Sequence, residues 1–351
     1  MRASCVFFRI SAVIICLLSL ASCTKDLTGR IIRFSASTRP DASTKTVYSG
    51  DVVGGRERID WSANDKIILA MKNDGGLTTP LVYEVNDIST VGVNSKTGLD
   101  AEDTSASMEW GTGTHDFWAG YPSTVTVGDH TLSAAIPANQ VATYDQKKDN
   151  VLLFKPDMNL AFMVAGLQSA PTDAGINLDF YPGFTTFDFT VGANADVTIE
   201  RFVMETEKYE EETAMIVPLS GTAVATFDPA SDMSYSFSTT GTTSQTIELT
   251  FNDGKGGSTT YNPIMSTSTS MNFKVFALPQ DLPGIRITFY FAGGTQKSLR
   301  LKQNDSWITF PAGVKANITG LLVPGATWYI NFDYPRQEQW IVHPDIEIGV
   351  E

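Results

Sequence analysis

Histidine is the side chain best suited to acid–base catalysis and metal binding near neutral pH, and this chain has three: His115, His130 and His343. None has a second histidine three or four residues away that could complete a metal-binding pair. His115 precedes Asp116 and could supply half of a catalytic dyad, but no Gly-x-Ser-x-Gly motif provides a nucleophile. We therefore predict a loop histidine at position 115 and no metal or cofactor.

Carboxylates offer two other kinds of site. Residues 73–76 and 252–254 look like fragments of calcium loops, yet neither has the regular downstream acids of an EF-hand. Asn-Gly and Asp-Gly sequences occur first of all in hairpin turns, which is the prediction made for both segments. A carboxylate pair for glycoside hydrolysis has no spacing signature, so a hydrolase stays open as a third alternative.

Three aromatic residues, Trp110, Trp118 and Tyr121, could form a platform on which a sugar stacks. The same residue types also fill the cores of β-sheets, because they bury a large apolar area. We favour the core interpretation and keep the sugar platform as an alternative.

Cysteine is the residue with the most specific chemistry. Two arginines and an apolar run ending at Leu20 precede Ala21-Ser22-Cys23, which is the outline of an export signal and resembles the lipobox of bacterial lipoproteins. The apolar run is about half of the roughly 20 residues that span a bilayer, so residues 1–22 are expected to be cleaved. Cys23 would then be acylated and hold the mature chain at a membrane. The other cysteines, Cys5 and Cys16, leave with the signal, which excludes disulfides and thiolate metal sites.

The composition narrows the function classes further. The 329 residues after the signal carry 23 basic and 39 acidic side chains, a formal charge of −16, which argues against nucleic acid as a partner. There is no long apolar stripe with a 3.6-residue period, whereas Thr, Ser, Val, Phe and Gly recur in short alternating runs. The chain is therefore predicted to be all-β, and its length favours two domains.

The order of the segments follows from alternation and from breaks in it. After a tether at residues 23–30, residues 31–37 form a first strand with one apolar face. The polar segment 169–175 contains Pro171 and Gly175, so the predicted domains are residues 31–172 and 173–327. Residues 328–351 alternate again, and such a strand needs a groove to lie in. The side chains that would enter that groove are Trp340, Val342, Ile346, Ile348 and Val350. The alternative is that this strand forms the edge of its own domain's sheet.

Several segments, taken in order, resemble the fimbrillin family of Bacteroidales, the lipoprotein-derived subunits of type V pili. Besides the lipobox, the resemblance rests on residues 44–48 (TKTVY), 59–61 (IDW), 64–67 (NDKI), 117–122 (FWAGYP), 136–140 (IPANQ) and 276–279 (FALP). The resemblance implies two tandem β-sandwich domains of transthyretin-like topology, no enzyme activity, and a fimbrium on the cell outer membrane. Its partners would be other pilus subunits, the outer membrane through the lipid, and a host or glycan receptor.

In that family an arginine-specific protease removes the first strand, and the exposed groove accepts a strand of another subunit. By resemblance the discarded strand is residues 31–37 and the donor is the C-terminal stretch. Arg39 stands at the expected cleavage position but is followed by Pro40, which trypsin-like proteases reject, so Arg33, Arg56 and Arg58 are the substitutes. Uncleaved members of the family serve as anchors or accessory subunits, so a shaft, tip or anchor role stays open. The alternative to a pilus subunit is a surface lipoprotein that binds glycan or another ligand through aromatics such as Trp110, Trp118 and Trp328.

Overall fold

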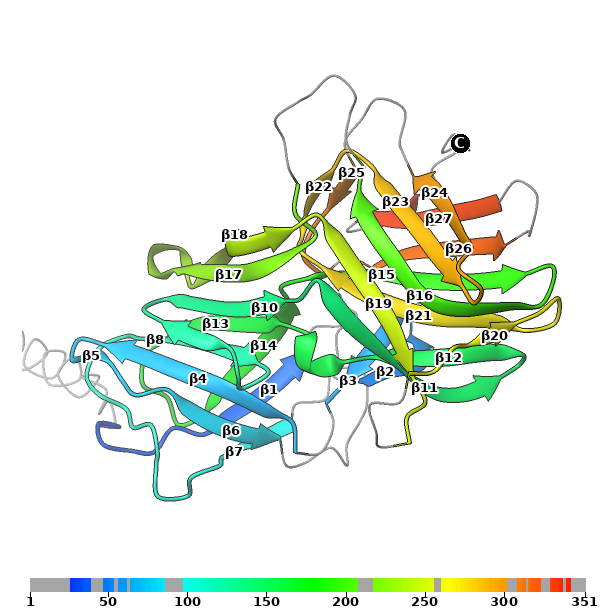
Figure 1. Ribbon diagram of the computed structural model, residues 1–351. Coiled ribbons are helices and arrows are strands. Elements are labelled where there is room, and N and C mark those ends of the chain that lie inside the picture. Colours follow the sequence, from blue (N-terminus) through cyan, green and yellow to red (C-terminus); the bar gives the residue numbers. More distant parts are fainter. Residues whose placement is uncertain are drawn as a thin grey trace, which may run out of the picture.

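The structure is a computed structural model built of β-strands with two single-turn 3-10 helices, η1 (Met158–Leu160) and η2 (Pro229–Ser231) (Figure 1). It describes residues 26–38, 47–53, 56–61, 64–85, 97–207, 217–255, 260–301, 308–313, 315–322, 329–336 and 339–341. The alternating β-branched and aromatic residues of these segments suit a pleated, half-buried surface. The predicted all-β class is confirmed.

The first sheet has eight strands in the order β5-β4-β6-β7-β1-β14-β13-β8, and β4 also pairs with β8, so that the sheet closes on itself. Its strands are β1 (Phe34–Thr38), β4 (Lys66–Asn73), β5 (Gly76–Leu77), β6 (Leu81–Val85), β7 (Thr97–Ala101), β8 (His115–Tyr121), β13 (Met163–Ser169) and β14 (Ile176–Pro182). The turn predicted at residues 73–76 is confirmed, since it joins β4 to β5 and the Gly75 amide donates to Asn73 Oδ1 at 2.8 Å.

A four-stranded sheet covers one side of the first sheet, in the order β18-β17-β10-β9. Its strands are β9 (Thr126–Gly128), β10 (Thr131–Ile136), β17 (Ser220–Asp228) and β18 (Ser234–Ser244). Leu132, Ala225 and Phe227 of this sheet belong to the same hydrophobic core as Phe34 and Phe117 of the first sheet. The two sheets therefore stabilise one another by sharing a core.

The third large sheet has twelve strands in the order β24-β23-β16-β19-β11-β12-β21-β15-β26-β27-β28, with β20 beside β16. Its strands are β11 (Asn139–Lys148), β12 (Val151–Pro156), β15 (Thr185–Ala193), β16 (Val197–Thr206), β19 (Thr246–Asn252), β20 (Ile264–Met265), β21 (Ser270–Ala277), β23 (Ile285–Phe291), β24 (Gln296–Leu301), β26 (Lys315–Leu322), β27 (Tyr329–Arg336) and β28 (Gln339–Ile341). Phe189 of β15 and Phe202 of β16 lie five places apart in the sheet, yet their rings are 4.7 Å apart. The sheet therefore folds over a core of its own, to which both rings belong.

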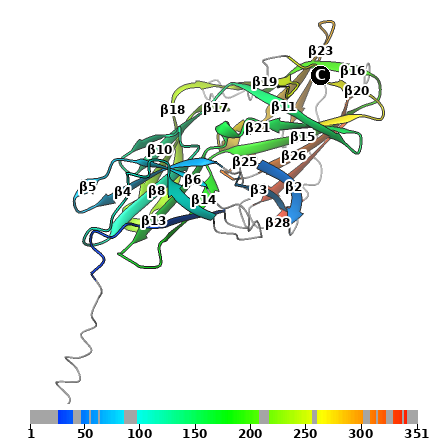
Figure 2. The same cartoon turned by 90° about the horizontal axis from the view of Figure 1, so that it is seen from below.

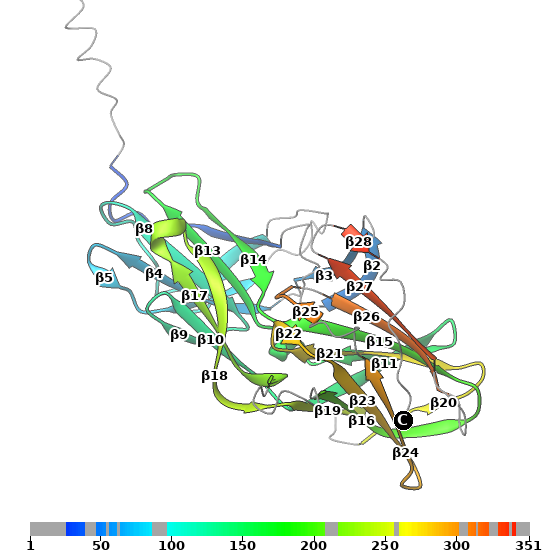
Figure 3. The ribbon, with the colours of Figure 1, turned by 90° about the horizontal axis from the view of Figure 1, so that it is seen from above.

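The chain passes repeatedly between the two cores. Strands β11 and β12 belong to the twelve-stranded sheet, β13 and β14 return to the first sheet, and β15 and β16 go back again. The predicted boundary between residues 172 and 173 lies between β13 and β14, which are neighbours in one sheet. Two small pairs complete the fold: β2 (Val47–Val53) with β3 (Arg56–Asp60), and β22 (Gln280–Leu282) with β25 (Ile308–Phe310). Figures 2 and 3 both place the β2–β3 hairpin beside β28.

The segments that carry the fimbrillin resemblance contact each other in space. Trp61 packs its ring edge-on against Tyr121 at 5.8 Å and against Phe180 at 5.3 Å. The buried amide of Gln140 donates to the Phe276 carbonyl at 2.6 Å and accepts from the Phe276 amide at 3.1 Å. The first contact lies within the first core, and the second joins β11 to β21 within the twelve-stranded sheet.

Candidate functional site

Strand β1 lies inside the first sheet, between two strands that are far from it in sequence (Figure 1). It pairs in parallel with β14 from Phe34 opposite Ile176 to Thr38 opposite Phe180. On its other edge it pairs antiparallel with β7, from Phe34 opposite Leu99 to Ala36 opposite Thr97. The N-terminal strand of the described chain is thus a central strand.

One face of the segment that leads through β1 fills the core. Ile32, Phe34 and Ala36 are buried, with 4%, 5% and 0% of their surface exposed. The Phe34 ring lies edge-on against Tyr83 at 5.3 Å and Phe117 at 5.7 Å. Burying an Ile or Phe side chain contributes about 1.5–3 kcal/mol each, so these residues hold β1 in the sheet.

The opposite face of β1 carries a polar ladder shared with β14. Ser35 donates to Asn177 Oδ1 at 3.0 Å, and the Asn177 amide donates to Ser37 Oγ at 3.0 Å. The same amide donates to Asp179 Oδ1 at 2.7 Å, and Ser37 hydrogen-bonds Asp179 as well. A one-residue shift of β1 would break the ladder and turn Phe34 to the outside, so the two faces together fix the register.

The segment before β1 is tied to the loop that precedes β8. The amide of Gly29 donates to the Trp110 carbonyl at 2.7 Å, and the amide of Trp110 donates back to the Arg30 carbonyl at 2.9 Å. On the β14 side, the Ile176 amide donates to the Arg33 carbonyl at 2.8 Å. Gly175 has a φ of +77°, and a Cβ there would lie 2.9 Å from that same carbonyl, so the close approach requires glycine.

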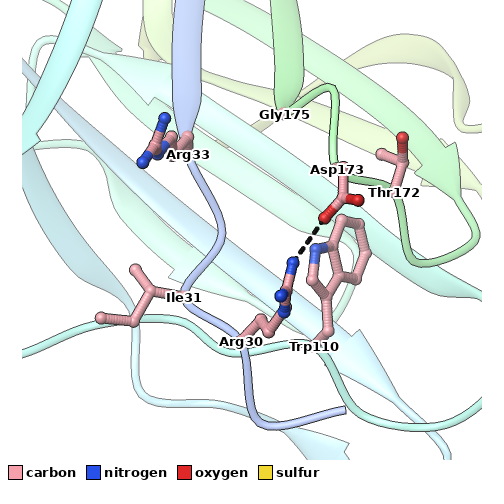
Figure 4. A pocket seen from close by; sticks show the side chains of 7 residues that line it. All are labelled: Arg30, Ile31, Arg33, Trp110, Thr172, Asp173 and Gly175. Atoms are coloured by element: carbon pink, nitrogen blue, oxygen red, sulfur yellow. Dashed lines mark hydrogen bonds and ion pairs between the residues drawn. The ribbon is translucent and has the colours of Figure 1, made fainter. Parts of the chain in front are cut away.

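A pocket of about 320 Å³ opens where this segment meets the two loops. Its lining residues are Arg30, Ile31, Arg33, Trp110, Thr172, Asp173 and Gly175 (Figure 4). Arg30 Nη1 is 2.7 Å from Asp173 Oδ1, and both side chains are about half exposed. Figure 4 shows the indole of Trp110 beside this ion pair and Arg33 farther along the strand.

The residues predicted for processing and donation occupy different places. Arg33 is exposed directly before β1, whereas Arg56 and Arg58 lie in β3. Trp340 lies in β28, which pairs with β27 at the edge of the twelve-stranded sheet. Cys23, Arg39, Val342, Ile346, Ile348 and Val350 lie outside the described residues. Of the predicted donor residues the structure therefore describes only Trp340, which lies in a strand at the edge of the chain's own sheet.

His115 and His130 lie within the described residues, whereas His343 does not, and each of the two is hydrogen-bonded within the fold. The prediction of a loop position for His115 is wrong, because this residue begins β8 and its surface is fully buried. His115 Nε2 accepts from the Gly111 amide at 2.9 Å, and Nδ1 faces the Gly113 carbonyl at 3.2 Å. Within the described part of the chain, no three His, Cys, Asp or Glu side chains are grouped so that they could hold a metal ion.

The aromatic residues considered for sugar stacking belong to the core. Trp110, Trp118 and Tyr121 have 3%, 0% and 5% of their surface exposed, which confirms the core interpretation. The Trp118 ring is covered by His130, whose ring stacks on it at 4.7 Å. A sugar platform made of these three residues is therefore excluded.

Sequence reasoning missed the residues of β14 that complete the site, Asn177 and Asp179. The sequence does indicate them, because polar Asn177 and Asp179 alternate with apolar residues. Those apolar residues, Ile176, Leu178 and Phe180, are buried in the structure. Asn and Asp are depleted in strands, so their place on the outer face of a central strand indicates a specific partner. That partner, β1, could not be identified from the sequence, since it lies about 140 residues away.

Comparison with known proteins finds solved structures of similar fold but no match in sequence. No protein-family model matches the chain, and no curated protein is similar to it in sequence. Among the described residues, no helix is long and apolar enough to cross a membrane. A putative cell adhesion protein from Bacteroides uniformis has a TM-score of 0.51 and 15% identity, over 87% of this chain and 97% of that one. Another from Bacteroides ovatus has a TM-score of 0.51 and 11% identity, over 90% and 99%. The chain is similar in fold to these two Bacteroides proteins, as the fimbrillin resemblance predicted.

Proposed function

We propose that the chain is a structural subunit of a cell-surface pilus that assembles by strand exchange. In this proposal the precursor is held at the outer membrane through an acylated Cys23. Strand β1 is then removed by proteolysis, and the C-terminal strand of another subunit takes its place. Main-chain hydrogen bonds would supply affinity and alternating side-chain pockets would supply the register.

The observation that carries the proposal is the position of β1 between β7 and β14. Removing a central strand leaves two rows of unpaired backbone N–H and C=O groups facing each other. It also empties the space of Ile32, Phe34 and Ala36, which face the core. An extended segment with apolar residues at every second position fits both features, and residues 340–350 have that pattern.

The position of β1 also distinguishes the candidate arginines at which cleavage would release β1 from those at which it would not. Cleavage after Arg33 would leave β1 attached to the body of the protein, because β1 starts at Phe34. Cleavage after Arg39, Arg56 or Arg58 would cut β1 away from β4 and the strands that follow. The bond after Arg39 is followed by Pro40, so we assign processing to the β3 arginines.

Two further facts support the proposal. The sequence resemblance to fimbrillins extends over segments that pack together in both cores. The two Bacteroides proteins of similar fold are named for cell adhesion. The alternative of a glycan-binding lipoprotein loses two of its three predicted aromatic contacts, because Trp110 and Trp118 are buried, whereas Trp328 lies outside the described residues.

The test uses a specific protease site placed between residues 39 and 46, after β1. Once cut and incubated to allow exchange, the chain is expected to form filaments that are visible by electron microscopy and elute in the void volume. Deleting residues 338–351 should leave the cut chain monomeric. A matched cut between residues 208 and 216, which follows β16, should produce no filaments. Filaments that form without the cut, or without residues 338–351, would reject strand exchange.

A further inference from the structure

The pocket beside Arg30 and Arg33 is unusual for this protein because of its charge. The whole chain has 39 acidic and 25 basic side chains, yet the pocket lining has two arginines and one aspartate. Arg30 is bound to Asp173, but no carboxylate among the described residues pairs with the Arg33 guanidinium, and Arg33 is exposed. An arginine without a carboxylate partner among the described residues therefore lines a pocket in an anionic protein.

Arginine in such a place selects a particular ligand chemistry. Its planar guanidinium offers parallel N–H donors that match a carboxylate or phosphate, and such charge-assisted bonds are among the strong ones. The pocket volume of about 320 Å³ is at the small end of ligand sites. Both facts fit a small polar molecule with one oxyanion, such as an acidic or phosphorylated monosaccharide.

The pocket is built by two parts of the chain that strand release would separate. Arg30, Ile31 and Arg33 belong to the segment that ends in β1, whereas Trp110 and Asp173 belong to loops of the body (Figure 4). A ligand bound between them touches both parts. The ligand must dissociate before the N-terminal segment can leave the body. By mass action it therefore stabilises the state in which β1 lies in the sheet.

We propose that this pocket binds a small oxyanion-bearing ligand and that its occupancy retains β1 in the sheet. The ligand site stands on the pocket alone, whereas its role in delaying strand exchange rests on the proposed function. In this account Arg33 binds the anion, Arg30 is held in place by Asp173, and the ligand closes the gap between the N-terminal segment and the loop at residues 172–175.

Binding is tested by titration calorimetry on the unprocessed chain with glucuronate, glucose 1-phosphate and inorganic phosphate, and with glucose as the neutral control. At least one anion should bind and glucose should not; the anion that binds tells a carboxylate source from a phosphate source. Arg33→Gln should weaken binding at least about tenfold, and Lys148→Gln, an exposed matched control, by less than about twofold. Asp173→Asn should strengthen binding, because it removes the competing carboxylate. Absence of binding, or binding unchanged in Arg33→Gln, would overturn the site.

Retention of β1 is tested by hydrogen exchange of a peptide that covers residues 31–38. With the ligand at ten times its dissociation constant, exchange of the β1 amides should slow by about tenfold, and exchange of β16 should not change. Unchanged β1 exchange with full binding would overturn retention. Neither measurement requires filaments. A chain that binds through Arg33 and protects β1 but never polymerises would reject the pilus proposal and leave this site standing.

Discussion

His115 is held in its neutral form by its surroundings. Burial lowers the pKa of His115, and the Gly113 carbonyl, Asp74 and Asp116 only partly oppose this effect. Because Nε2 accepts from the Gly111 amide, protonation would break that hydrogen bond. The pKa in the folded state is therefore below the value of about 6.5 expected in the unfolded chain.

We predict that His115 stabilises the fold only while it is neutral. Its contribution is fully present above pH 6.5 or so and is lost as the pH falls through the lowered folded pKa. In urea denaturation, wild type should exceed His115→Gln in stability at pH 7, and the difference should shrink toward pH 5. A difference that is independent of pH would contradict this assignment.

Asp188 is a buried carboxylate that contacts two lysine side chains. Lys274 Nζ lies 3.1 Å and Lys315 Nζ 3.4 Å from Asp188 Oδ2, and the Asn272 amide donates to Oδ1 at 2.7 Å. Burial alone would raise the pKa of Asp188, but the two ammonium groups and the amide outweigh it and hold the pKa below its usual range. The carboxylate thus stays charged and neutralises two cations that are largely buried.

Removing that charge should be costly. Asp188→Asn leaves both lysines without their counter-ion, and breaking a buried pair costs about 3–5 kcal/mol in the free energy of unfolding. The matched control is the exposed Asp281→Asn, for which a change within about 0.5 kcal/mol is expected. Both are measured by chemical denaturation at pH 7. Equal effects of the two substitutions would show that the cluster is not stabilising.

At the scale of the element, alternation predicted the strands because each has one buried face. Residues 31–37 were predicted as a first strand with Ile32, Phe34 and Ala36 on the apolar face, and these three are buried. The strand partners could not be predicted, since nothing in residues 31–37 points to β14. The same limit hid the contact of Asp188 with Lys274, which depends on β15 lying beside β21.

The two faces of β1 should differ in their effect on stability. Phe34→Ala removes a ring packed against Tyr83 and Phe117, so it should cost about 3–5 kcal/mol in the free energy of unfolding. Ser35→Ala on the outer face loses one hydrogen bond and should cost about 1 kcal/mol. Urea denaturation of both variants checks the ratio. Comparable costs would mean that β1 is not held by its apolar face.

At the scale of the whole molecule, the sequence predicted an all-β chain but not its path. Turn-rich segments such as residues 169–175 indicate a break between strands, and a break does not reveal whether the next strand stays in the same sheet. Here β13 and β14 stay together, and the chain changes cores elsewhere, for example between β10 and β11. Directly after this change, Gln140 at the start of β11 hydrogen-bonds the backbone of Phe276 in β21 of the same sheet.

The predicted membrane attachment of the whole molecule depends on a single residue, Cys23. Cys23→Ser removes the thiol that would be acylated, and stable anchoring needs two or more acyl chains. In detergent partition of whole cells the protein should therefore move from the detergent phase to the aqueous phase. Cys16→Ser, inside the signal, is the matched control and should change nothing. Detergent-phase partition that survives Cys23→Ser would exclude acylation at this residue.

The most direct measurement of strand exchange is an intermolecular disulfide in the groove of β1. In a Cys23→Ser background the mature chain has no cysteine, so Asn177→Cys on β14 can be combined in turn with Asp345→Cys, Glu347→Cys or Gly349→Cys. Asn177 lies opposite Ser35 of β1, so a donor residue that replaces Ser35 would bring its cysteine within bonding distance. After β1 is cut away, a reducible ladder of oligomers is expected from at least one pair and none from the uncut chain. A ladder that is absent from all three pairs, or equal with and without the cut, would contradict the account.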